Sequence, residues 1–438
     1  MSEKLPIRVA FHGLAAGGEA VGRGADGKTV FAPFAARGDV ARVQIGEEKK
    51  TFSRGVIEAI EIESPSRTTP QCPQFRPQTP LHSCGGCAWQ HVSLGQQRDA
   101  KRDMVQNALS RLGGQNVEVE ATCGGAGYAY RNKADFVVGR EGIGFFARES
   151  HDLIAAKVCP IQHPQNEEIL RAANQILQEN PQFAFDAATG RGDWRRLVAR
   201  VSTGGETLTT IVTAHSSWSE SERVAALLRE RVPSLVGVLA RGPKSEAKRV
   251  WGRDWLVERA NGLDFRVSGE AFWQVNAEIS PLLALGALEL AEVKAGQRAL
   301  DLFCGAGFFA LHLARSGADV MGIETHRGAI RDAIWNAKNA GLKAQFRAGD
   351  AARELGRFKR GDFDLILLDP PRAGAAACLE SLQRIAPQRI VYVSCDPATL
   401  ARDAKTLCGG YVLRRALAFD LFPQTAHVET VALFERRD

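Results

Sequence analysis

The amino-acid sequence predicts a multidomain protein: a small N-terminal β-barrel, a central α+β domain and a C-terminal α/β domain of Rossmann-like type. Three observations lead to this prediction. The chain has 438 residues, more than one ordinary hydrophobic core accommodates. Glycine-rich turns break its first residues into short apolar runs, and regular strand–helix alternation begins near residue 266. We place the domains at residues 1–64, 65–265 and 266–438.

Composition and charge describe a globular protein without a membrane segment. Hydrophobic residues make up 45% of the chain and charged residues 24%, as is usual in soluble proteins. No run approaches the ~18 apolar residues that a bilayer requires, and residues 1–10 lack the apolar core of a signal peptide. We therefore expect a cytoplasmic monomer with no membrane partner. The formal net charge of +6 permits a polyanionic partner without demonstrating one.

Residues 5–62 carry the pattern of five short strands. Asp26-Gly27 and Arg37-Gly38-Asp39 are turn signals between apolar runs, and the run at 51–64 alternates as a closing strand does. Five strands with glycine-rich turns fit a small barrel of OB-like type, a common platform for single-stranded nucleic acid.

The central region predicts one helix followed by a mixed domain. Residues 93–114 have helical spacing and stop at Gly113-Gly114. From residue 128 to about 265, strand-like runs predominate, with helical segments at 166–180 and 219–232. This mixture indicates an α+β domain.

Four cysteines are too clustered to be ordinary core residues. Cys72, Cys84 and Cys87 lie in one turn-rich segment, and Cys159 lies in a second. In a cytoplasmic protein such a group indicates a metal centre rather than disulfides. Four thiolates suit either zinc or an iron–sulfur cluster, and their spacing does not decide between the two.

The C-terminal domain places glycines and acids at the ends of successive predicted strands. The segment 301–307 follows a strand and opens a helix, where Gly305 and Gly307 let the backbone approach a ligand closely. The acids after the next three strands are Glu324, Asp350 and Asp369. A glycine loop alone would also fit a nucleotide-dependent dehydrogenase. The whole succession, which ends in D-P-P-R, resembles the class I S-adenosylmethionine-dependent methyltransferases.

A cysteine at the edge of the same sheet indicates the chemistry. Cys395 follows the strand-like run at 389–394, and a thiolate there can add to carbon 6 of a pyrimidine and make carbon 5 nucleophilic. A lone cysteine is more often a buried structural residue, but the neighbouring D-P-P loop favours a nucleophile. Glu429 is the best candidate for the base that removes the carbon-5 proton, and His427 is the second.

Together these motifs resemble the RNA uracil-5-methyltransferase family over the whole chain. The matching segments are FWQVN at 272–276, DLFCGAG at 301–307, LLDPPRAG at 367–374, VSCDPATLARD at 393–403 and DLFPQTAHVE at 420–429. The resemblance implies an N-terminal TRAM barrel, a central iron–sulfur domain and a C-terminal class I methyltransferase domain. In the family, the helical segment near 93–120 packs with the catalytic domain.

The resemblance also implies cofactors and residue roles. Cys395 would be the nucleophile and Glu429 the base. The methyl donor would be S-adenosylmethionine, and a [4Fe–4S] cluster would be held by Cys72, Cys84, Cys87 and Cys159. The residues implied to contact the methyl donor or the target base are Gln274, Phe303, Glu324, Asp350 and Asp369, beside the loop glycines Gly305 and Gly307.

RNA is the partner that the resemblance implies. The barrel favours 23S ribosomal RNA, because several transfer-RNA enzymes of the family lack it; a transfer RNA is the alternative. RNA cytosine-5 methylation is disfavoured, because those enzymes generally use a differently placed pair of cysteines. A non-catalytic iron–sulfur RNA-binding protein is the rival of another class, and it would have no use for Cys395 or Glu429.

Three features depart from the family pattern. Eleven residues separate Cys72 from Cys84, a longer loop than is usual. Phe308 stands where many relatives carry asparagine, so we expect packing to replace a polar contact to the methyl donor. Asp396 stands where asparagine is frequent, and its charge would raise the pKa of the Cys395 thiol unless Arg372 or Arg402 pairs with it.

Overall fold

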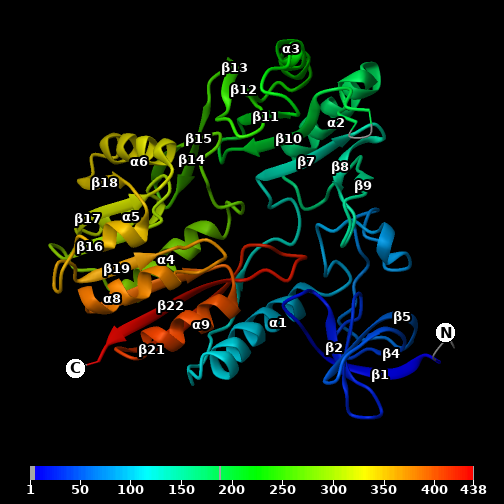
Figure 1. Cartoon of the computed structure of the whole chain (residues 1–438), viewed down its shortest axis with the longest axis horizontal. Coiled ribbons are helices and arrows are strands. Elements are labelled where there is room, and N and C mark those ends of the chain that lie inside the picture. Colours follow the sequence, from blue (N-terminus) through cyan, green and yellow to red (C-terminus); the bar gives the residue numbers. More distant parts are fainter. Residues whose placement is uncertain (1–4, 187–188, 438) are drawn as a thin grey trace.

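The computed structural model describes residues 5–186 and 189–437. The outer ends of the first and last predicted domains, residues 1–4 and 438, lie outside the described residues, as do residues 187–188 within the predicted central domain. Figure 1 shows the barrel at lower right, the central sheet and its helices above it, and the catalytic domain at left. Across the described ranges, no helix combines the length and the apolar character needed to cross a membrane.

The N-terminal segment forms a closed five-stranded barrel, as predicted. Its strands follow one another in the order β1-β2-β3-β5-β4. Alternate side chains, among them Val9, Phe11, Val30 and Val43, point inward and fill it. The strands are β1 (Ile7–Leu14), β2 (Ala20–Arg23), β3 (Thr29–Ala32), β4 (Val40–Glu48) and β5 (Phe52–Ile62).

The central region is built on a seven-stranded sheet with the order β13-β12-β11-β10-β7-β8-β9. Its strands are β7 (Lys133–Gly139), β8 (Gly142–Phe146), β9 (Leu153–Ala155), β10 (Trp194–Val201), β11 (Thr207–Thr213), β12 (Leu235–Arg241) and β13 (Lys248–Gly252). The helices α2 (Pro164–Glu179) and α3 (Ser221–Arg231) cover one face of the sheet. The other face is turned toward the loop at residues 421–428, which is drawn in red (Figure 1). Ile169, Leu197 and Ile211 belong to the core between the helices and the sheet.

A two-stranded hairpin joins the central region to the catalytic domain. It consists of β14 (Trp255–Ala260) and β15 (Leu263–Ser268), so β15 runs across the predicted boundary at residue 265. Phe265 belongs to the hydrophobic core of the catalytic domain. The backbone N–H of Arg266 donates to Oδ1 of Asn336, 2.6 Å away, in α6 (Arg327–Asn339).

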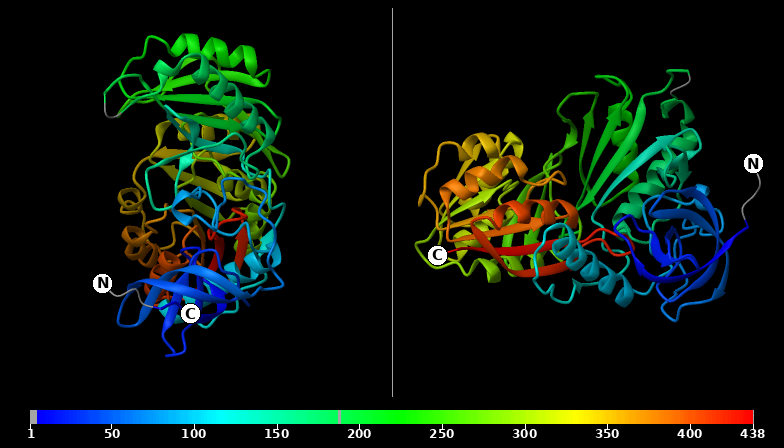
Figure 2. Two further views of the ribbon diagram at one scale, coloured as in Figure 1. Left: turned by 90° about the vertical axis from the view of Figure 1, so that its right-hand side faces the viewer. Right: turned by 60° about the horizontal axis from the view of Figure 1, so that its bottom comes forward.

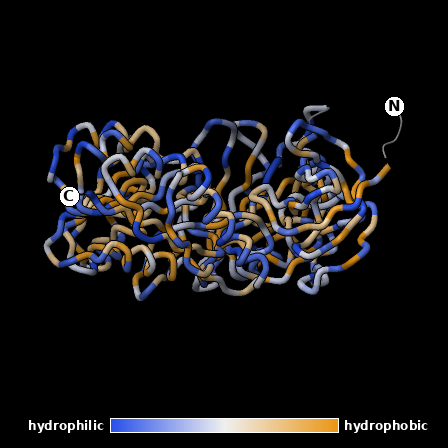
Figure 3. Tube along the Cα trace, turned by 90° about the horizontal axis from the view of Figure 1, so that it is seen from below, coloured by the Kyte–Doolittle hydropathy of each residue, from blue (hydrophilic) through white to orange (hydrophobic). Residues whose placement is uncertain are grey.

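The catalytic domain contains an eight-stranded sheet with the order β18-β17-β16-β19-β20-β22-β21-β6. The strands are β16 (Arg298–Leu302), β17 (Asp319–Glu324), β18 (Ala344–Ala348), β19 (Leu365–Leu368), β20 (Arg389–Ser394), β21 (Tyr411–Asp420), β22 (Glu429–Arg436) and β6 (Cys123–Gly124). Besides α6, its helices are α4 (Ser280–Ala291), α5 (Phe308–Arg315), α7 (Ala351–Leu355), α8 (Leu379–Ile385) and α9 (Pro397–Leu407). Figure 3 shows apolar and hydrophilic segments alternating along the trace.

The sheet is parallel from β18 to β20 and then becomes antiparallel. β22 is inserted between β20 and β21 and runs antiparallel to both. The last two long strands of the chain, β21 and β22, thus form an antiparallel pair. The sequence does not indicate that β6, from the central region, forms the outer edge beside β21.

Helix α1 (Leu94–Asn107) connects the barrel with the catalytic domain, and Figure 2 shows it lying between them. Ala100 and Met104 pack in the barrel cluster, whereas Val105 and Leu109 pack among residues of the catalytic sheet and α9. Lys101, fully buried, forms an ion pair with the buried Asp420 at the end of β21. The helix therefore serves two cores at once.

We predict that Lys101→Met weakens this junction. The change leaves the Asp420 carboxylate buried without its main partner, which typically costs about 3–5 kcal/mol. The expected result is a lower midpoint of thermal unfolding and faster hydrogen exchange in α1 and β21. The double variant Lys101→Met/Asp420→Leu should regain most of the loss, since an apolar pair of similar volume can replace a buried ion pair. A single variant as stable as the parent protein would contradict this prediction.

Candidate active site

The glycine loop after β16 has the backbone of a ligand-binding loop. Phe303, Gly305 and Gly307 have φ values of 63°, 53° and 88°, and Gly307 caps α5. A non-glycine residue in the left-handed region costs free energy and is held there by its surroundings, which is common at binding sites. The loop therefore presents backbone groups at the start of a helix, as the sequence predicts.

Asp301, at the base of this loop, is a candidate that the sequence analysis missed. Its side chain is fully buried; Oδ2 accepts a hydrogen bond from the N–H of Ala310, 2.8 Å away, and Oδ1 is buried without a partner among the described residues. Burial raises the pKa of Asp301 well above its usual value, and the charges of Asp369 and Glu324 raise it further. Its position in the DLFCGAG segment, as the acid that directly precedes the glycine loop, could have identified it as a candidate.

Glu324 lies beside the glycine loop, because β17 is the neighbour of β16. Its Oε2 accepts a hydrogen bond from the N–H of Gly305 at 3.3 Å. Its Oε1 accepts from the N–H of His326 at 2.8 Å and from the hydroxyl of Thr325 at 2.9 Å. These contacts fix the carboxylate at the carboxyl end of the parallel strands, where ligands of such sheets bind.

Asp350 caps α7. Its Oδ1 accepts a hydrogen bond from the N–H of Arg353 at 3.0 Å, and its side chain is exposed. A helix cap accounts for an aspartate at this position without any ligand. Its contact with the methyl donor stays a prediction.

Asp369 and Gln274 are polar groups with little protein contact to satisfy them. Asp369 follows β19, and burial raises its pKa to about 7. Gln274 is 6% exposed, and its side-chain amide has no hydrogen-bond partner within the described part of the chain; only its backbone carbonyl accepts, from Asn132 at 3.3 Å. A buried polar group usually has a partner, so both fit a site that is completed by a ligand.

Cys395 and Glu429 face each other across two adjacent strands. β20 and β22 are antiparallel with Ser394 opposite Thr430, so the residue after Ser394 stands against the residue before Thr430. Cys395 is half-buried and Glu429 is 4% exposed. The structure thus brings the predicted nucleophile and base together from positions that are far apart in the chain.

The surroundings of Cys395 hold its thiol in the neutral form. Burial, followed by the charges of Glu429 and Asp369, raises the pKa of Cys395 to about 11, while Arg372 acts to lower it. Burial also raises the pKa of Glu429 well above its usual value; Asp369 adds to this effect and Arg372 opposes it. The thiol and the two acids are therefore electrostatically coupled, with Arg372 as the cation common to the thiol and Glu429.

Neither Arg372 nor Arg402 pairs with Asp396, and the charge of Asp396 raises the pKa of the Cys395 thiol, as expected for a carboxylate without an arginine partner. Asp396 caps α9: its Oδ1 accepts from the N–H groups of Ala398 and Thr399, both at 2.9 Å. Arg402 instead bonds Asp403, and Arg372 donates to Nδ1 of His427 at 2.9 Å. The helix N-terminus satisfies the Asp396 carboxylate, and Asp396 ranks last among the causes that shift the pKa of Cys395.

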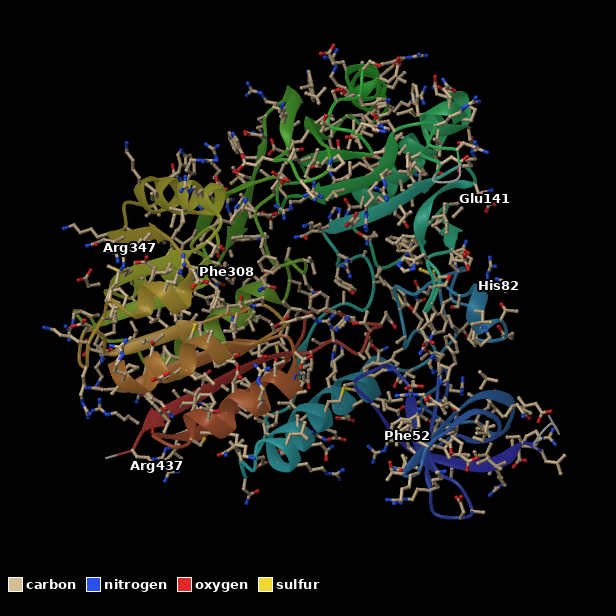
Figure 4. The ribbon with its side chains drawn as sticks, viewed as in Figure 1. Phe52, His82, Glu141, Phe308, Arg347 and Arg437 are labelled. Carbon is tan, nitrogen blue, oxygen red and sulfur yellow. The ribbon has the colours of Figure 1, made fainter. Side chains whose placement is uncertain are left out.

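Phe308 fills its position by packing, as expected. Its ring lies 5.1 Å from that of Trp273 and 5.3 Å from that of His312, both edge-to-face. Figure 4 shows Phe308 inside the catalytic domain, at the start of α5. Through Trp273, this aromatic cluster packs against the FWQVN segment at 272–276.

Cys72, Cys84, Cys87 and Cys159 line one cavity of about 170 Å³. Burial raises the pKa of each thiol, to about 12 for Cys87. The long loop between Cys72 and Cys84 still brings Cys72 to this cavity. Over residues 5–186 and 189–437, however, no three His, Cys, Asp or Glu side chains are arranged to hold a metal ion.

The strand order and the acids at the strand ends define the protein as a class I methyltransferase with an N-terminal barrel. The chain belongs to the tRNA (uracil-5-)-methyltransferase family, whose model matches residues 95–437. This confirms the expected RNA (uracil-5-)-methyltransferase as the enzyme class.

The sequence similarity to individual relatives extends over nearly the whole chain. An uncharacterized RNA methyltransferase of Halalkalibacterium halodurans is 33% identical over 94% of this chain and 93% of that protein. The 23S rRNA (uracil(1939)-C(5))-methyltransferase RlmD of Edwardsiella ictaluri is 35% identical over 96% of this chain and 94% of that protein. The crystal structure of Pyrococcus abyssi tRNA (uracil-54, C5)-methyltransferase in complex with S-adenosyl-L-homocysteine is similar with a TM-score of 0.77, at 25% identity, over 98% of this chain and 100% of that one.

We predict opposite effects of two substitutions on the reactivity of Cys395. Asp369→Asn removes a negative charge, lowers the pKa of the thiol and increases its alkylation by iodoacetamide at pH 8. Arg372→Met removes the stabilising cation, raises that pKa and slows alkylation. Each substitution should change the alkylation rate by about threefold or more, since one neighbouring charge can shift a pKa by about one unit.

Mass spectrometry of the peptide that contains Cys395 measures these rates, and the half-buried Cys408 on the same chain provides an internal reference. Rates that change in the same direction in both variants, or together with the rate at Cys408, would contradict the electrostatic account.

Proposed function

We propose that this enzyme transfers the methyl group of S-adenosylmethionine to carbon 5 of a uridine in 23S ribosomal RNA through a covalent cysteine–uracil adduct. The observation that carries the proposal is the register of β20 and β22, which sets Cys395 against Glu429 at the edge of the sheet. A methyltransferase that acts on a ring nitrogen or a hydroxyl has no need of this pair.

The methyl donor fits the loop and the strand-end acids. S-adenosylmethionine supplies an electrophilic methyl group on a positively charged sulfur. Glu324, held beside Gly305, is placed to accept hydrogen bonds from ribose hydroxyls. A cationic ligand beside the unpartnered Oδ1 of Asp301 and beside Asp369 would favour the ionised forms of these two acids, which burial otherwise disfavours.

Cys395 and Glu429 each take part in one proton transfer. The thiol of Cys395 gives its proton to solvent water, and its sulfur forms a bond to carbon 6 of the uracil as the double bond between carbons 5 and 6 opens. Carbon 5 then takes the methyl group, and S-adenosylhomocysteine leaves. Glu429, whose pKa burial raises well above its usual value, then takes the proton from carbon 5. The bond between sulfur and carbon 6 breaks, the double bond re-forms, and Cys395 leaves as a thiolate that Arg372 stabilises.

The central sheet offers a surface for the RNA that surrounds the target. Its open face carries a cavity of about 600 Å³, lined among others by Phe146, Phe185, Arg195, Arg241 and Lys244. Arg195 lies 5.0 Å from the centre of the Phe185 ring. Arginine and aromatic side chains on an open sheet are the usual means of binding unpaired bases and phosphates, and a target uridine must leave its stack to reach Cys395.

The choice of 23S ribosomal RNA rests on the greater identity with the ribosomal enzyme, 35% against 25% for the transfer-RNA enzyme. The barrel does not separate the two substrates, because the similarity to the transfer-RNA enzyme covers 98% of this chain, the barrel included. Transfer RNA is accordingly the second candidate.

We also propose that Cys72, Cys84, Cys87 and Cys159 hold a [4Fe–4S] cluster. Their convergence on one cavity supports this, as does the electrostatic interaction of the Cys159 thiol with the other three. The bound cluster would keep all four sulfurs deprotonated, since metal ligation replaces the thiol protons that burial otherwise retains. These residues would thereby tie two turn-rich segments of the central region together.

The metal content tests this part of the proposal. We expect anaerobically purified protein to contain about four iron and four sulfide per chain, and Cys159→Ser to lose most of both. Cys408→Ser, a change at a half-buried cysteine outside the cavity, is the matched control and should retain them. Protein that holds about one zinc and no sulfide would refute the cluster.

The adduct tests the mechanism. We expect Cys395→Ala to abolish methylation, because it removes the thiol that adds to carbon 6. Glu429→Gln should complete methyl transfer and then accumulate a protein–RNA adduct that survives a denaturing gel, because the carbon-5 proton is not removed. Cys408→Ala should behave like the parent enzyme.

Transcripts labelled with tritium at uracil carbon 5 separate the substrates. Release of tritium from a 23S ribosomal fragment and not from transfer RNA is the expected result. Release from transfer RNA alone would change the substrate, release from labelled cytosine would change the base, and an active Cys395→Ala enzyme would overturn the mechanism.

A further inference from the structure

We propose that His427 is a positioning residue rather than a base: it holds Arg372 against the Cys395–Glu429 pair, and a clamp formed by Gln97 and Gln424 fixes the loop that carries it. This inference rests on the proposed function, because it assigns a task within the same reaction. It takes the second candidate base of the sequence analysis out of the proton transfers.

The contact between His427 and Arg372 determines which role the imidazole can play. Nη2 of Arg372 donates to Nδ1 of His427 at 2.9 Å, so this nitrogen acts as an acceptor and the ring is neutral. Burial, and then the charges of Arg372, Lys101 and Arg131, lower the pKa of His427 to about 4, with Asp396 opposing them. A neutral acceptor orients the guanidinium and leaves its positive charge intact.

The loop between β21 and β22 is fixed by other parts of the chain. The carbonyl of Leu421 accepts from Asn276 at 3.2 Å, that of Phe422 from Lys101 at 3.0 Å, and that of Pro423 from Tyr130 at 3.0 Å. The carbonyl of Gln424 accepts from the N–H groups of Ala88 and Trp89 at 2.9 and 3.0 Å. Four consecutive carbonyls are thus held by four separate segments.

Gln424 is the centre of this arrangement. It is 3% exposed and adopts a left-handed conformation with φ 69°, which a glutamine retains only where its surroundings over-determine it. Its N–H donates to Oε1 of Gln97 at 2.8 Å, and its Oε1 accepts from Nε2 of Gln97 at 3.0 Å. Gln97 is fully buried in α1, so the helix holds both the backbone and the side chain of Gln424.

The position of this loop determines the charge around the nucleophile. His427 lies three residues after Gln424, and Phe422 packs edge-to-face against its ring at 5.8 Å. The charged groups that act on Cys395 are Glu429, Asp369 and Asp396, which raise its pKa, and Arg372, which lowers it. Among the described residues named here, Arg372 is the cation that lowers this pKa, so a shift of Arg372 removes what favours the thiolate.

Alkylation of Cys395 without RNA or methyl donor tests the proposal apart from turnover. We expect His427→Ala to slow alkylation at pH 8 by about threefold, in the same direction as Arg372→Met. The double variant should be no slower than Arg372→Met alone, because two residues that act through one contact are not additive. His427→Asn, whose amide oxygen also accepts from arginine, should restore most of the rate.

The clamp has its own pair of variants. Gln97→Met removes the hydrogen bonds to Gln424 at similar volume and should slow alkylation as His427→Ala does. Gln96→Ala, on the same helix, removes the side-chain hydrogen bonds to the backbone of Arg37 and keeps the backbone N–H that Ser93 caps, and it should leave the rate at Cys395 unchanged. If Gln97→Met does not fold, the His427 variants test the proposal by themselves.

Three outcomes would overturn the inference: an unchanged rate in His427→Ala, additive effects in the double variant, or a protein–RNA adduct that accumulates in His427→Ala as it does in Glu429→Gln. The last result would make His427 a base. Failure of the proposed function is recognised separately, as methylation by Cys395→Ala, and it does not depend on any of these rates.

Discussion

The insertion of β22 between β20 and β21 is the constraint on which the active site depends. A parallel continuation of the sheet would place the last strand at an edge and send Glu429 away from Cys395. The antiparallel insertion instead pairs Ser394 with Thr430, so the thiol and the acid meet where both strands leave the sheet. Their closeness then makes each group raise the free energy of the other's ionised form, and Arg372 compensates for part of this cost.

The loop between β21 and β22, which this strand order creates, is held by hydrogen bonds from other parts of the chain. Residues 421–424 direct their carbonyls to Asn276, Lys101, Tyr130 and the Ala88-Trp89 backbone. The last of these segments follows directly on Cys87, and Trp89 also donates to the carbonyl of Gly18 in the barrel at 3.0 Å. The barrel, the cysteine-bearing segment and α1 therefore all contact the loop between β21 and β22. Their positions relative to Cys395 and Glu429 are fixed through this loop.

Much of the fold could be predicted from local patterns. Strand-like runs with glycine turns predicted the five-stranded barrel, and alternating strands and helices predicted the parallel part of the catalytic sheet, because periodicity reports which face of each element is buried. The edge strand β6, with two residues, was too short to have a pattern. The family resemblance implied only that α1 packs with the catalytic domain, and its packing against the barrel as well was not predicted. Residues such as Met104 and Val105 show that a helix is amphipathic but not what it packs against.

The sequence by itself determined the chemical inventory: a glycine loop, acids at strand ends, a thiol after a strand and four clustered cysteines. These depend on residue type and short spacing, which the chain states directly. Only the tertiary structure decided the pairings. Asp396 caps a helix instead of meeting an arginine, Asp301 is buried with one oxygen unsatisfied, and Arg372 bonds His427. Such contacts join residues whose distance depends on strand order and register, and long-range pairing leaves no periodic trace in the sequence.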